Sequence, residues 1–436
     1  MSNSSSFDAV IIGAGVIGCS IALALARKGY RTLNVDRLPA PGYGSTSSSA
    51  AIIRPYYSTV EGTALAYEGH FYWREWADFL GLAADADLAS YVECGCLVLM
   101  PAGEDRLAAT QRTLAAVGVP FDVLGPDELR RFAPTINLES FAPPKRIDDP
   151  AFGVPNGGSL AGAVFCPTGG YINDPQLACQ NLAQASMRHG ARYRFNRQVT
   201  EIRRSGGRVT GLVLDDGARI DTPVVINAAG PHSSHINALA GVADTMAIKT
   251  GAMKQEVVHV PAPAGFDFGV RGNVITDGDA GVYMRPETGN HMLIGSLEPS
   301  CDTLEWADPD RFVAELSEQS TNQLWRAAQR FPTLGIPNQT QGLAALYDVS
   351  SDWIPIYDRS DCDGYFMAIG TSGNQFKNAP IVGEMMAELV DFSGRGGDHD
   401  AAPMDFHLRH IDRRLSLSFF SRRRPVHAES SFSVLG

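Results

Sequence analysis

The chain has 436 residues, of which 44% are apolar and 19% are charged. A chain of this length predicts two domains rather than one compact core, and its apolar content excludes a globally disordered protein. The 36 Lys and Arg residues against 48 Asp and Glu residues give a net charge of −12, which argues against nucleic acid or an anionic membrane as the main partner.

The cysteines and the first residues indicate the cellular compartment of the protein. Seven cysteines are scattered along the chain without a histidine cluster, so we expect reduced thiols, a cytoplasmic protein and no metal site. Residues 1–6 are polar and lack the basic stretch of a targeting signal. The longest early apolar run, residues 16–26, is too short to cross a bilayer, so no integral membrane span is expected. The oligomeric state is left open.

The first predicted elements form a β-α-β unit. Residues 8–12 have the pattern of a short buried strand, and apolar residues then recur at helical spacing as far as Gly29, a natural helix end. Residues 31–35 predict a second strand, which ends at Asp36. An α/β domain therefore begins close to the first residue.

Three glycines stand between the first strand and the helix. Gly13, Gly15 and Gly18 would allow a tight turn, close approach of the backbone to a pyrophosphate, and close packing of the helix on the strand. The helix N-terminus would face the phosphates with its dipole. Asp36 lies 18 residues after Gly18, where a carboxylate accepts hydrogen bonds from ribose hydroxyls. The unit predicts a dinucleotide site, and it fits NAD and FAD equally.

The remaining elements follow in chain order. Up to residue 170 the pattern predicts a loop over 39–49, a helix over 62–79, a strand over 91–100, a helix with a return strand over 101–123, a short helix over 127–132 and a loop-rich region over 141–170. Beyond it the pattern predicts a helix over 174–189, strands at 192–204, 209–215, 219–220 and 224–226, a second sheet within 249–295, a helix over 308–331, strands over 343–357 and 365–369, and a helix over 381–390. The polar tail from Ser393 is unassigned, and its basic run 422–424 either docks on the acidic body or, as we expect, is solvated.

Two later segments have the composition of ligand-binding turns. The strand at 224–226 ends in small residues, 227–230, which either pack against a dinucleotide or form an ordinary turn. Residues 370–377 run into a helix, and their amides either face an anionic group or belong to a plain connecting loop. The local pattern leaves both alternatives open at each segment.

Taken together, the landmarks resemble a known family over nearly the whole chain, up to about Leu389. The landmarks are the Gly13–Gly18 unit, Ser45-Thr46-Ser47, Arg54, Asn227-Ala228-Ala229-Gly230, Tyr283-Met284-Arg285-Pro286, Asp352-Trp353-Ile354-Pro355 and Gly373-x-x-Phe376-Lys377. In this order they are similar to the D-amino-acid-oxidase superfamily of flavoproteins, and within it to the sarcosine-oxidase-like branch.

The resemblance implies an α/β fold with two discontinuous domains. A doubly wound, Rossmann-like FAD-binding domain would use residues 1–90, 150–235 and 340–392. An interleaved α+β substrate domain, built on a large antiparallel sheet, would use 91–149 and 236–339, and 393–436 would form a C-terminal tail. The active site is expected between the two domains.

The resemblance also implies site residues. Arg54 and Lys377 would hold a substrate carboxylate, the arginine as a bidentate fork and the lysine as a point charge. Tyr57 either lines the same pocket or packs in the core. The residues expected to bind FAD are Gly13, Gly15, Gly18, Asp36, Arg37, Ser45, Thr46, Ser47, Val199, Ala229, Gly230, Gly373, Asn374, Gln375, Phe376 and Lys377.

Three positions depart from relatives in this family. Some relatives tether FAD through a cysteine, where this chain has Ala345, and others through a histidine in the loop that here reads Ser45 to Ser49. We therefore expect noncovalent FAD. No lysine falls within residues 291–295, where relatives carry one that activates oxygen, so either oxygen or another electron acceptor is compatible with the sequence. Lys254 is placed nearby by analogy only.

The function implied is FAD-dependent oxidation of the C–N bond of a small amino acid by hydride transfer to the flavin, giving an imine that hydrolyses. Sarcosine, other N-methyl amino acids, cyclic imino acids and D-amino acids all fit a carboxylate clamp. Two alternatives stand beside this function: an NAD-dependent dehydrogenase, and a catalytically silent flavin-binding partner subunit. His232 and His235 are interpreted as structural residues rather than catalytic bases.

Overall fold

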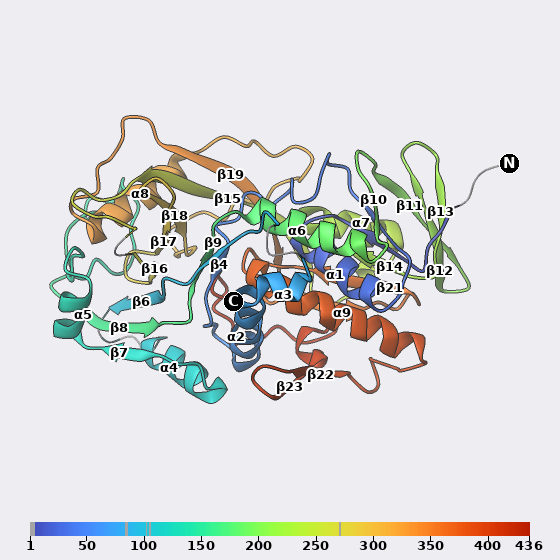
Figure 1. The fold of residues 1–436 in the computed structure, drawn as a ribbon. Coiled ribbons are helices and arrows are strands. Elements are labelled where there is room, and N and C mark those ends of the chain that lie inside the picture. Colours follow the sequence, from blue (N-terminus) through green and yellow to red (C-terminus); the bar gives the residue numbers. More distant parts are fainter. Residues whose placement is uncertain (1–4, 83–85, 102, 104–105, 270–271) are drawn as a thin grey trace.

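The computed structural model describes residues 5–82, 86–101, 103, 106–269 and 272–436. Two large sheets organise it, one of six strands and one of eight. In Figure 1 the eight-stranded sheet occupies the left half of the molecule and the six-stranded sheet the right half. This arrangement confirms the predicted α/β fold class.

The six-stranded sheet contains the predicted β-α-β unit. Its strands, in spatial order, are β10 (Arg192–Arg194), β3 (Thr32–Val35), β2 (Ala9–Ile12), β14 (Val225–Asn227), β21 (Tyr365–Ile369) and β20 (Ile356–Arg359). Every neighbouring pair is parallel except β20 with β21. The carboxyl ends of β2, β3 and β14 therefore meet at one edge, where an open α/β sheet binds its ligand.

Strand β2 is apolar throughout because both of its faces are buried. Ala9 and Ile11 pack against helices α1 (Val16–Arg27), α6 (Pro175–Arg188) and α9 (Ala379–Gly394). Val10 and Ile12 belong to the core on the opposite face. That face is covered by helix α7 (Ser233–Ala240) and by a second sheet, whose strands in order are β1 (Ser5–Ser6), β13 (Arg219–Asp221), β12 (Arg208–Leu214) and β11 (Val199–Ser205).

The eight-stranded sheet builds the other half of the molecule. Its strands, in order, are β19 (Gln341–Ser350), β15 (Thr250–Pro261), β18 (His291–Ser296), β17 (Val282–Glu287), β16 (Val274–Asp277), β6 (Cys96–Pro101), β8 (Leu160–Cys166) and β7 (Asp122–Leu124). All pairs are antiparallel except β16 with β6, so the sheet is mixed rather than purely antiparallel. Strands β8 and β19 fall in the ranges 150–235 and 340–392, which were predicted for the FAD domain, yet both pair in this sheet.

One predicted helix beside this sheet is shorter than expected. Helix α8 spans Glu318–Arg330, whereas the pattern predicted 308–331. Ser317 caps its first turn by accepting a hydrogen bond from the amide of Gln319 at 3.2 Å. Residues 308–316 form no helix and instead reach toward the six-stranded sheet. Helices α4 (Arg106–Val117) and α5 (Pro126–Phe132) cover the far end of the eight-stranded sheet.

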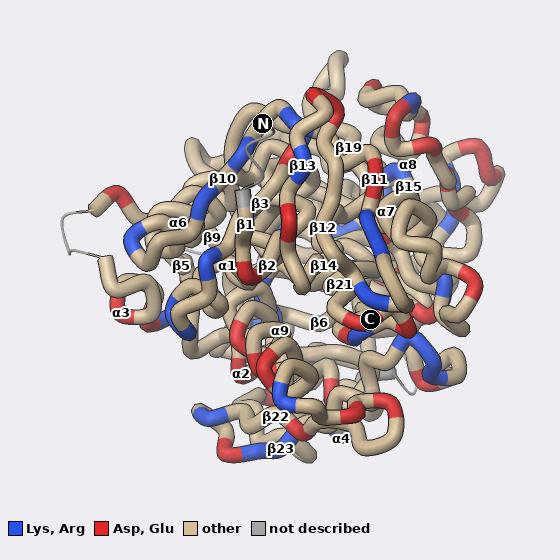
Figure 2. Tube along the Cα trace, turned by 90° about the vertical axis from the view of Figure 1, so that its right-hand side faces the viewer, with Lys and Arg blue, Asp and Glu red and all other residues tan. Residues whose placement is uncertain are grey.

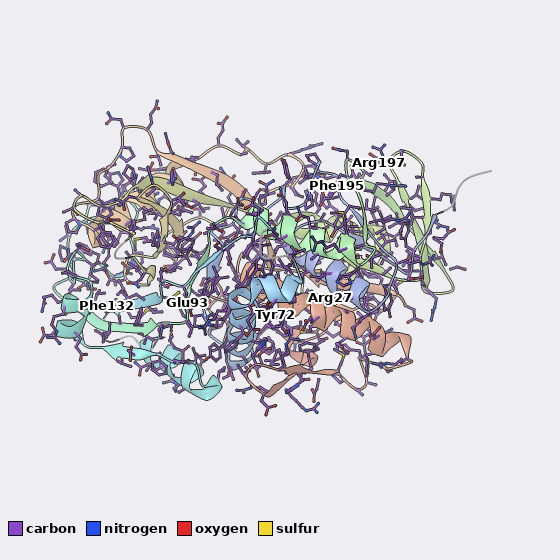
Figure 3. The ribbon with its side chains drawn as sticks, in the orientation of Figure 1. Arg27, Tyr72, Glu93, Phe132, Phe195 and Arg197 are labelled. Carbon is purple, nitrogen blue, oxygen red and sulfur yellow. The ribbon has the colours of Figure 1, made fainter. Side chains whose placement is uncertain are left out.

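Between the two sheets lies a small three-stranded sheet that positions Arg54. It consists of β4 (Ile52–Ile53), β9 (Gly170–Ile172) and β5 (Tyr91–Val92), and Arg54 follows directly after β4. Helices α2 (Val60–Arg74) and α3 (Trp76–Leu80) come next in the chain. Tyr72 of α2, near the centre of the molecule in Figure 3, donates a hydrogen bond to Glu384 of α9 at 2.7 Å. None of the described helices is long and apolar enough to cross a membrane.

The tail is ordered against the body, and the prediction of a solvated basic run is wrong. It forms the hairpin β22 (Asp405–Leu408) and β23 (Arg413–Ser416). Arg422 is fully buried and pairs with Asp358, Asp361 and Asp400 at 2.6–3.0 Å. Arg424 is also buried, and it binds Asp352 at 2.8 Å. Figure 2, which faces the right-hand side of the view in Figure 1, shows basic and acidic residues interspersed along the chain, with the hairpin β22–β23 at its lower edge.

Removing the buried guanidinium should destabilise the protein. We expect Arg422→Ala to lower the free energy of unfolding by about 3–5 kcal/mol, because three carboxylates would lose their partner and one of them, Asp358, is fully buried. The neighbouring Arg423 is 50% exposed, so Arg423→Ala should cost less than about 1 kcal/mol. Urea unfolding of both variants measures the difference. Equal losses would show that the tail is not anchored through Arg422.

Candidate active site

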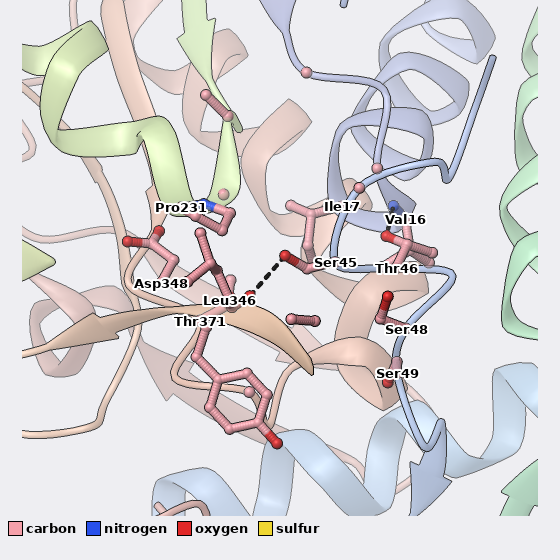
Figure 4. Close-up of a pocket in the computed structure, with 18 of the residues that line it drawn as sticks. Val16, Ile17, Ser45, Thr46, Ser48, Ser49, Pro231, Leu346, Asp348 and Thr371 are labelled. Atoms are coloured by element: carbon pink, nitrogen blue, oxygen red, sulfur yellow. Dashed lines mark hydrogen bonds between the residues drawn. The ribbon is translucent and has the colours of Figure 1, made fainter. Parts of the chain in front are cut away.

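A cavity of about 800 Å³ lies between the six-stranded and eight-stranded sheets. Its walls come from the turn after β2, the loop at 43–52, the start of β11, the turn after β14, strands β15 and β19, and the loop at 371–377. Figure 4 shows part of this wall, with Ser45, Thr46, Ser48 and Ser49 across from Leu346, Asp348 and Thr371. The cavity is large enough for a cofactor and a small substrate.

The glycines after β2 have no room for side chains. A Cβ on Gly13 would lie 2.3 Å from the carbonyl oxygen of Ala228, and the Gly13 φ of +113° is a conformation that favours glycine. A Cβ on Gly18 would lie 2.3 Å from the carbonyl oxygen of Gly13. All three glycines were predicted to bind FAD, but only Gly13 and Gly15 line the cavity. Gly18 does not line it, and its lack of a side chain lets the helix pack on the strand.

The Ser/Thr loop is attached to the glycine turn. The hydroxyl oxygen of Thr46 accepts a hydrogen bond from the amide of Val16 at 3.0 Å, which caps the first turn of α1. Ser45 donates to the carbonyl oxygen of Leu346 in β19 at 2.7 Å, as Figure 4 shows. Ser45 and Thr46 line the cavity, whereas Ser47 does not, because its hydroxyl turns back to the carbonyl oxygen of Gly44 at 3.1 Å.

Asp36 and Arg37, which were predicted to bind FAD, also line the cavity. Asp36 accepts hydrogen bonds from the amides of Ala14 and Leu38 at 2.7 and 2.8 Å, and burial raises its pKa above the usual value. Arg37 forms an ion pair with Asp310, which also lies 3.1 Å from Nε2 of His232. The 308–312 loop thus closes over one edge of the cavity.

Val199, Ala229 and Gly230 line the cavity, and so do the predicted residues of the 373–377 loop. Asp348 of β19 holds that loop. Its carboxylate accepts from the amide of Gly370 at 2.6 Å and from the hydroxyl of Ser233 at 2.8 Å, and its carbonyl oxygen accepts from the amide of Ser372 at 2.7 Å. Burial raises the pKa of Asp348 to about 7. The sequence analysis missed Asp348, which no local motif marks.

The raised pKa of Asp348 makes stability depend on pH. Because its folded pKa of about 7 exceeds the ordinary value of 3.8, its contribution to stability is fully present below about pH 4 and is lost as the pH rises through 7. We expect the unfolding free energy of the wild type, relative to Asp348→Asn, to fall by about 3 kcal/mol between pH 5 and pH 8. Urea unfolding of FAD-free protein measures this change, and Asp215→Asn, at an exposed site, is the control. A constant difference would refute the titration.

Arg54 and Lys377 are brought together at Tyr57, which both of them contact. Cζ of Arg54 lies 4.4 Å from the centre of the Tyr57 ring, and Nζ of Lys377 donates to the Tyr57 hydroxyl at 2.8 Å. Both cations line the cavity, at 6% and 2% exposure, whereas Tyr57 lies behind them and does not. Of the two sequence alternatives for Tyr57, its position fits core packing.

The electrostatics of this pair are unusual. Within the described part of the chain, neither Arg54 nor Lys377 forms an ion pair with a carboxylate. Burial, followed by the charge of Arg54, lowers the pKa of Lys377 well below its usual value. Burial also raises the pKa of Tyr57 to about 12, so its hydroxyl keeps its proton at neutral pH. Arg54 therefore presents a positive charge to the cavity that is paired with no carboxylate of the described residues.

Lys254 is not a third cation of the cavity. In β15 the side chains alternate between faces, and Gln255 and Val257 line the cavity while Lys254 does not. Lys254 is buried with Glu256, whose carboxylate lies 3.1 Å from its Nζ. Two further lining residues, Val434 and Leu435, come from the tail, to which the sequence analysis assigned no role.

Comparison with known proteins confirms the family resemblance. The model of the FAD-dependent oxidoreductase family (DAO) matches residues 8–389. Glycine oxidase of Geobacillus kaustophilus is 25% identical over 415 residues, which cover 93% of this chain and 98% of the relative. Sarcosine oxidase subunit beta of Rhodobacter capsulatus is 24% identical over 388 residues, covering 88% and 84%.

Solved structures share the fold. L-proline dehydrogenase from P. horikoshii superposes with a TM-score of 0.74 at 20% identity, covering 97% of this chain and 98% of that one. The crystal structure of the G. kaustophilus glycine oxidase gives a TM-score of 0.74 at 22% identity, covering 97% and 100%. The chain therefore belongs to the DAO family of FAD-dependent oxidoreductases, whose model matches it from before the glycine turn to beyond the 373–377 loop.

Proposed function

We propose that this protein oxidises the C–N bond of a small amino acid whose carboxylate is held by Arg54 and Lys377. The amino acid would lose a hydride from its α carbon and a proton from its nitrogen, and water would then hydrolyse the imine to a carbonyl compound and an amine or ammonia. Two relatives are named glycine oxidase and sarcosine oxidase, which supports a small amino acid as the substrate class.

The observation that carries this proposal is the pair of buried cations. Removing a charge from water is costly unless an opposite charge or strong hydrogen bonds replace the lost solvation. Arg54 and Lys377 are almost fully buried, they face the cavity, and they have no carboxylate partner among the described residues. A substrate carboxylate would supply the missing charge, and it would raise the lowered pKa of Lys377 again.

The residues around the cavity fit FAD. Gly13 and Gly15 leave space for the pyrophosphate beside the start of α1, and Asp36 and Arg37 stand where the ribose would lie. The 373–377 loop, held by Asp348, would contact the flavin. When bound, FAD accepts the hydride. We propose that it is held noncovalently, because Ala345 lines the cavity and offers no thiol.

The roles proposed for the protein's own groups are binding and orientation. Arg54 offers a planar fork to the carboxylate, and Tyr57 contacts both the guanidinium and the Lys377 side chain. Fixing the carboxylate leaves the α carbon as the next atom along the substrate, so its C–H can be aimed at the cofactor. Positioning of this kind supplies much of the rate in reactions that need no protein nucleophile.

An absorbance spectrum under anaerobic conditions tests the function. We expect purified protein to show flavin bands that bleach with at least one of glycine, N-methyl, cyclic or D-amino acids. The methyl ester of the same amino acid, which lacks the carboxylate charge, should bleach the flavin far more slowly. The rate at which the colour returns in air separates an oxidase from a dehydrogenase with another acceptor.

Two other outcomes would change the interpretation. Flavin bands that no amino acid bleaches would favour a catalytically silent flavin-binding partner subunit. Equal bleaching by an amino acid and its ester would contradict the carboxylate site while leaving amine oxidation intact. The nicotinamide alternative is replaced by FAD, because the family to which the chain belongs uses FAD.

A further inference from the structure

The end of the tail enters the active-site cavity. We call residues 430–436 the tail segment. Just before it, Arg424 is anchored by Asp352 at 2.8 Å, and the hydroxyl of Ser430 donates to the carbonyl oxygen of Asp352 at 2.6 Å. From this anchor the segment runs to the cavity, where Val434 and Leu435 form part of the lining. The contacts of Arg424 and Ser430 with Asp352 therefore fix the start of the tail segment to the body of the protein.

Val434 connects the tail segment to the predicted carboxylate anchor. Its carbonyl oxygen accepts a hydrogen bond from Nη2 of Arg54 at 2.7 Å, and its amide donates to Oε2 of Glu298 at 2.9 Å. The other terminal nitrogen of Arg54 donates to the carbonyl oxygen of Tyr56. Backbone carbonyls on both sides thus fix the plane of the guanidinium, and one of the two belongs to the tail.

The side chains of the tail segment form part of the apolar wall beside Arg54. Val434 is 8% exposed and belongs to an apolar cluster with Tyr283 and Trp353. Leu435 packs against the same cluster from its edge. Gly436 lies so close to Tyr57 that a Cβ there would be 2.4 Å from the ring, and the Ser58 amide donates to the Gly436 oxygen at 3.3 Å. The apolar surface beside Arg54 is therefore supplied in part by residues 434 and 435.

We propose that Val434 and Leu435 determine which amino-acid side chains the site accepts. This inference rests on the proposed function, because it takes Arg54 and Lys377 as the carboxylate ligands. The groups attached to the α carbon of a bound substrate are only two bonds from its carboxylate carbon, so they lie beside the residues next to Arg54. The side chains of Val434 and Leu435 then limit the size of those groups, and the carbonyl oxygen of Val434 orients the guanidinium.

The test uses FAD-loaded protein and simple carboxylates of increasing size, namely acetate, 2-methylpropanoate and benzoate. Binding is measured from the change that each carboxylate causes in the flavin absorbance, so no turnover is required. Val434→Ala and Leu435→Ala should favour benzoate over acetate by about tenfold relative to wild type, because each removes at least two methyl groups from the wall. Val434→Leu should shift the same ratio in the opposite direction.

A matched control lies in the same tail. Val426 is 50% exposed and outside the cavity, so Val426→Ala makes the same chemical change without touching the wall. It should leave the benzoate-to-acetate ratio unchanged. A general loss of stability would weaken the binding of every carboxylate in both Val434→Ala and Val434→Leu. Shifts of the benzoate-to-acetate ratio in opposite directions therefore cannot result from such a loss.

The outcomes separate this inference from the function on which it rests. If carboxylates bind to wild type and Arg54→Ala abolishes their binding, but the size ratio stays constant in all the Val434 and Leu435 variants, the tail segment does not set specificity and only this inference fails. If no carboxylate perturbs the flavin of wild type, the carboxylate site itself is wrong and the inference falls with it. A ratio that follows the size of residues 434 and 435 supports the inference.

Discussion

Arg54→Ala is expected to raise the KM for the amino-acid substrate by about 100-fold or more while FAD stays bound. The variant removes the guanidinium that contacts Tyr57 together with Lys377, and truncating one partner of a buried charged hydrogen bond costs about 2–5 kcal/mol. Steady-state kinetics give KM, and the flavin-to-protein absorbance ratio shows whether the cofactor is retained. Unchanged KM with full flavin would contradict the carboxylate role.

Two further variants separate charge from geometry. Arg54→Lys keeps a positive charge but loses the planar fork, so it should recover only part of the affinity. Arg130 of α5 is 64% exposed and lies outside the cavity, so Arg130→Ala removes the same charge without changing KM. Because Arg54 also holds the carbonyl oxygen of Val434, the loss of binding should be accompanied by looser packing of the tail segment. Hydrogen exchange of residues 430–436 would detect that loosening.

Gly15→Ala is expected to weaken FAD binding by up to about a hundredfold while the protein still folds. The backbone φ of Gly15 is −74°, which any residue adopts, so the substitution introduces no backbone strain. A Cβ would lie 3.1 Å from the hydroxyl oxygen of Thr46, next to the cavity that the pyrophosphate would occupy. Overpacking of this kind costs about 1–3 kcal/mol. Titrating the apoprotein with FAD measures the change.

The choice of glycine decides whether this experiment is informative. Gly13→Ala would combine a φ of +113° with a backbone contact of 2.3 Å, so it should prevent folding and would say nothing about FAD. Gly335 has open space around it and lies outside the cavity, so Gly335→Ala serves as the control. An FAD affinity for Gly15→Ala equal to that of the Gly335→Ala control would exclude close contact of the backbone at Gly15 with the cofactor.

The parts of the fold that depend on local pattern were predictable. The strand predicted at 8–12 and the helix that ends before Gly29 appear as Ala9–Ile12 and Val16–Arg27. A short apolar strand, a glycine turn and a helix interact with their immediate neighbours in the chain, so the pattern specifies them. The landmarks near Arg54 and Lys377 were also informative, and the structure brings these two residues to the same tyrosine.

The parts that depend on distant partners were not predictable. A run of three arginines has the composition of a solvated segment, and only the fold brings Asp358, Asp361 and Asp400 around Arg422. Sequence pattern likewise gave no sign that residues 434 and 435 reach the cavity, because these two apolar residues in so short a segment have no periodicity that would assign them a partner. The overlong helix prediction at 308–331 failed because residues 308–316 are used to reach the edge of the cavity instead.

The contact between that loop and Arg37 bears on how fast the cofactor leaves. Arg37 and Asp310 are 273 positions apart in the chain, both line the cavity, and their side chains are 39% and 45% exposed. An exposed pair of this kind contributes little free energy and is weakened by salt. The ion pair would slow the dissociation of the cofactor while contributing little to the free energy of its binding. The dissociation rate of FAD should therefore rise with ionic strength, whereas Asp310→Asn should make that rate high and insensitive to salt.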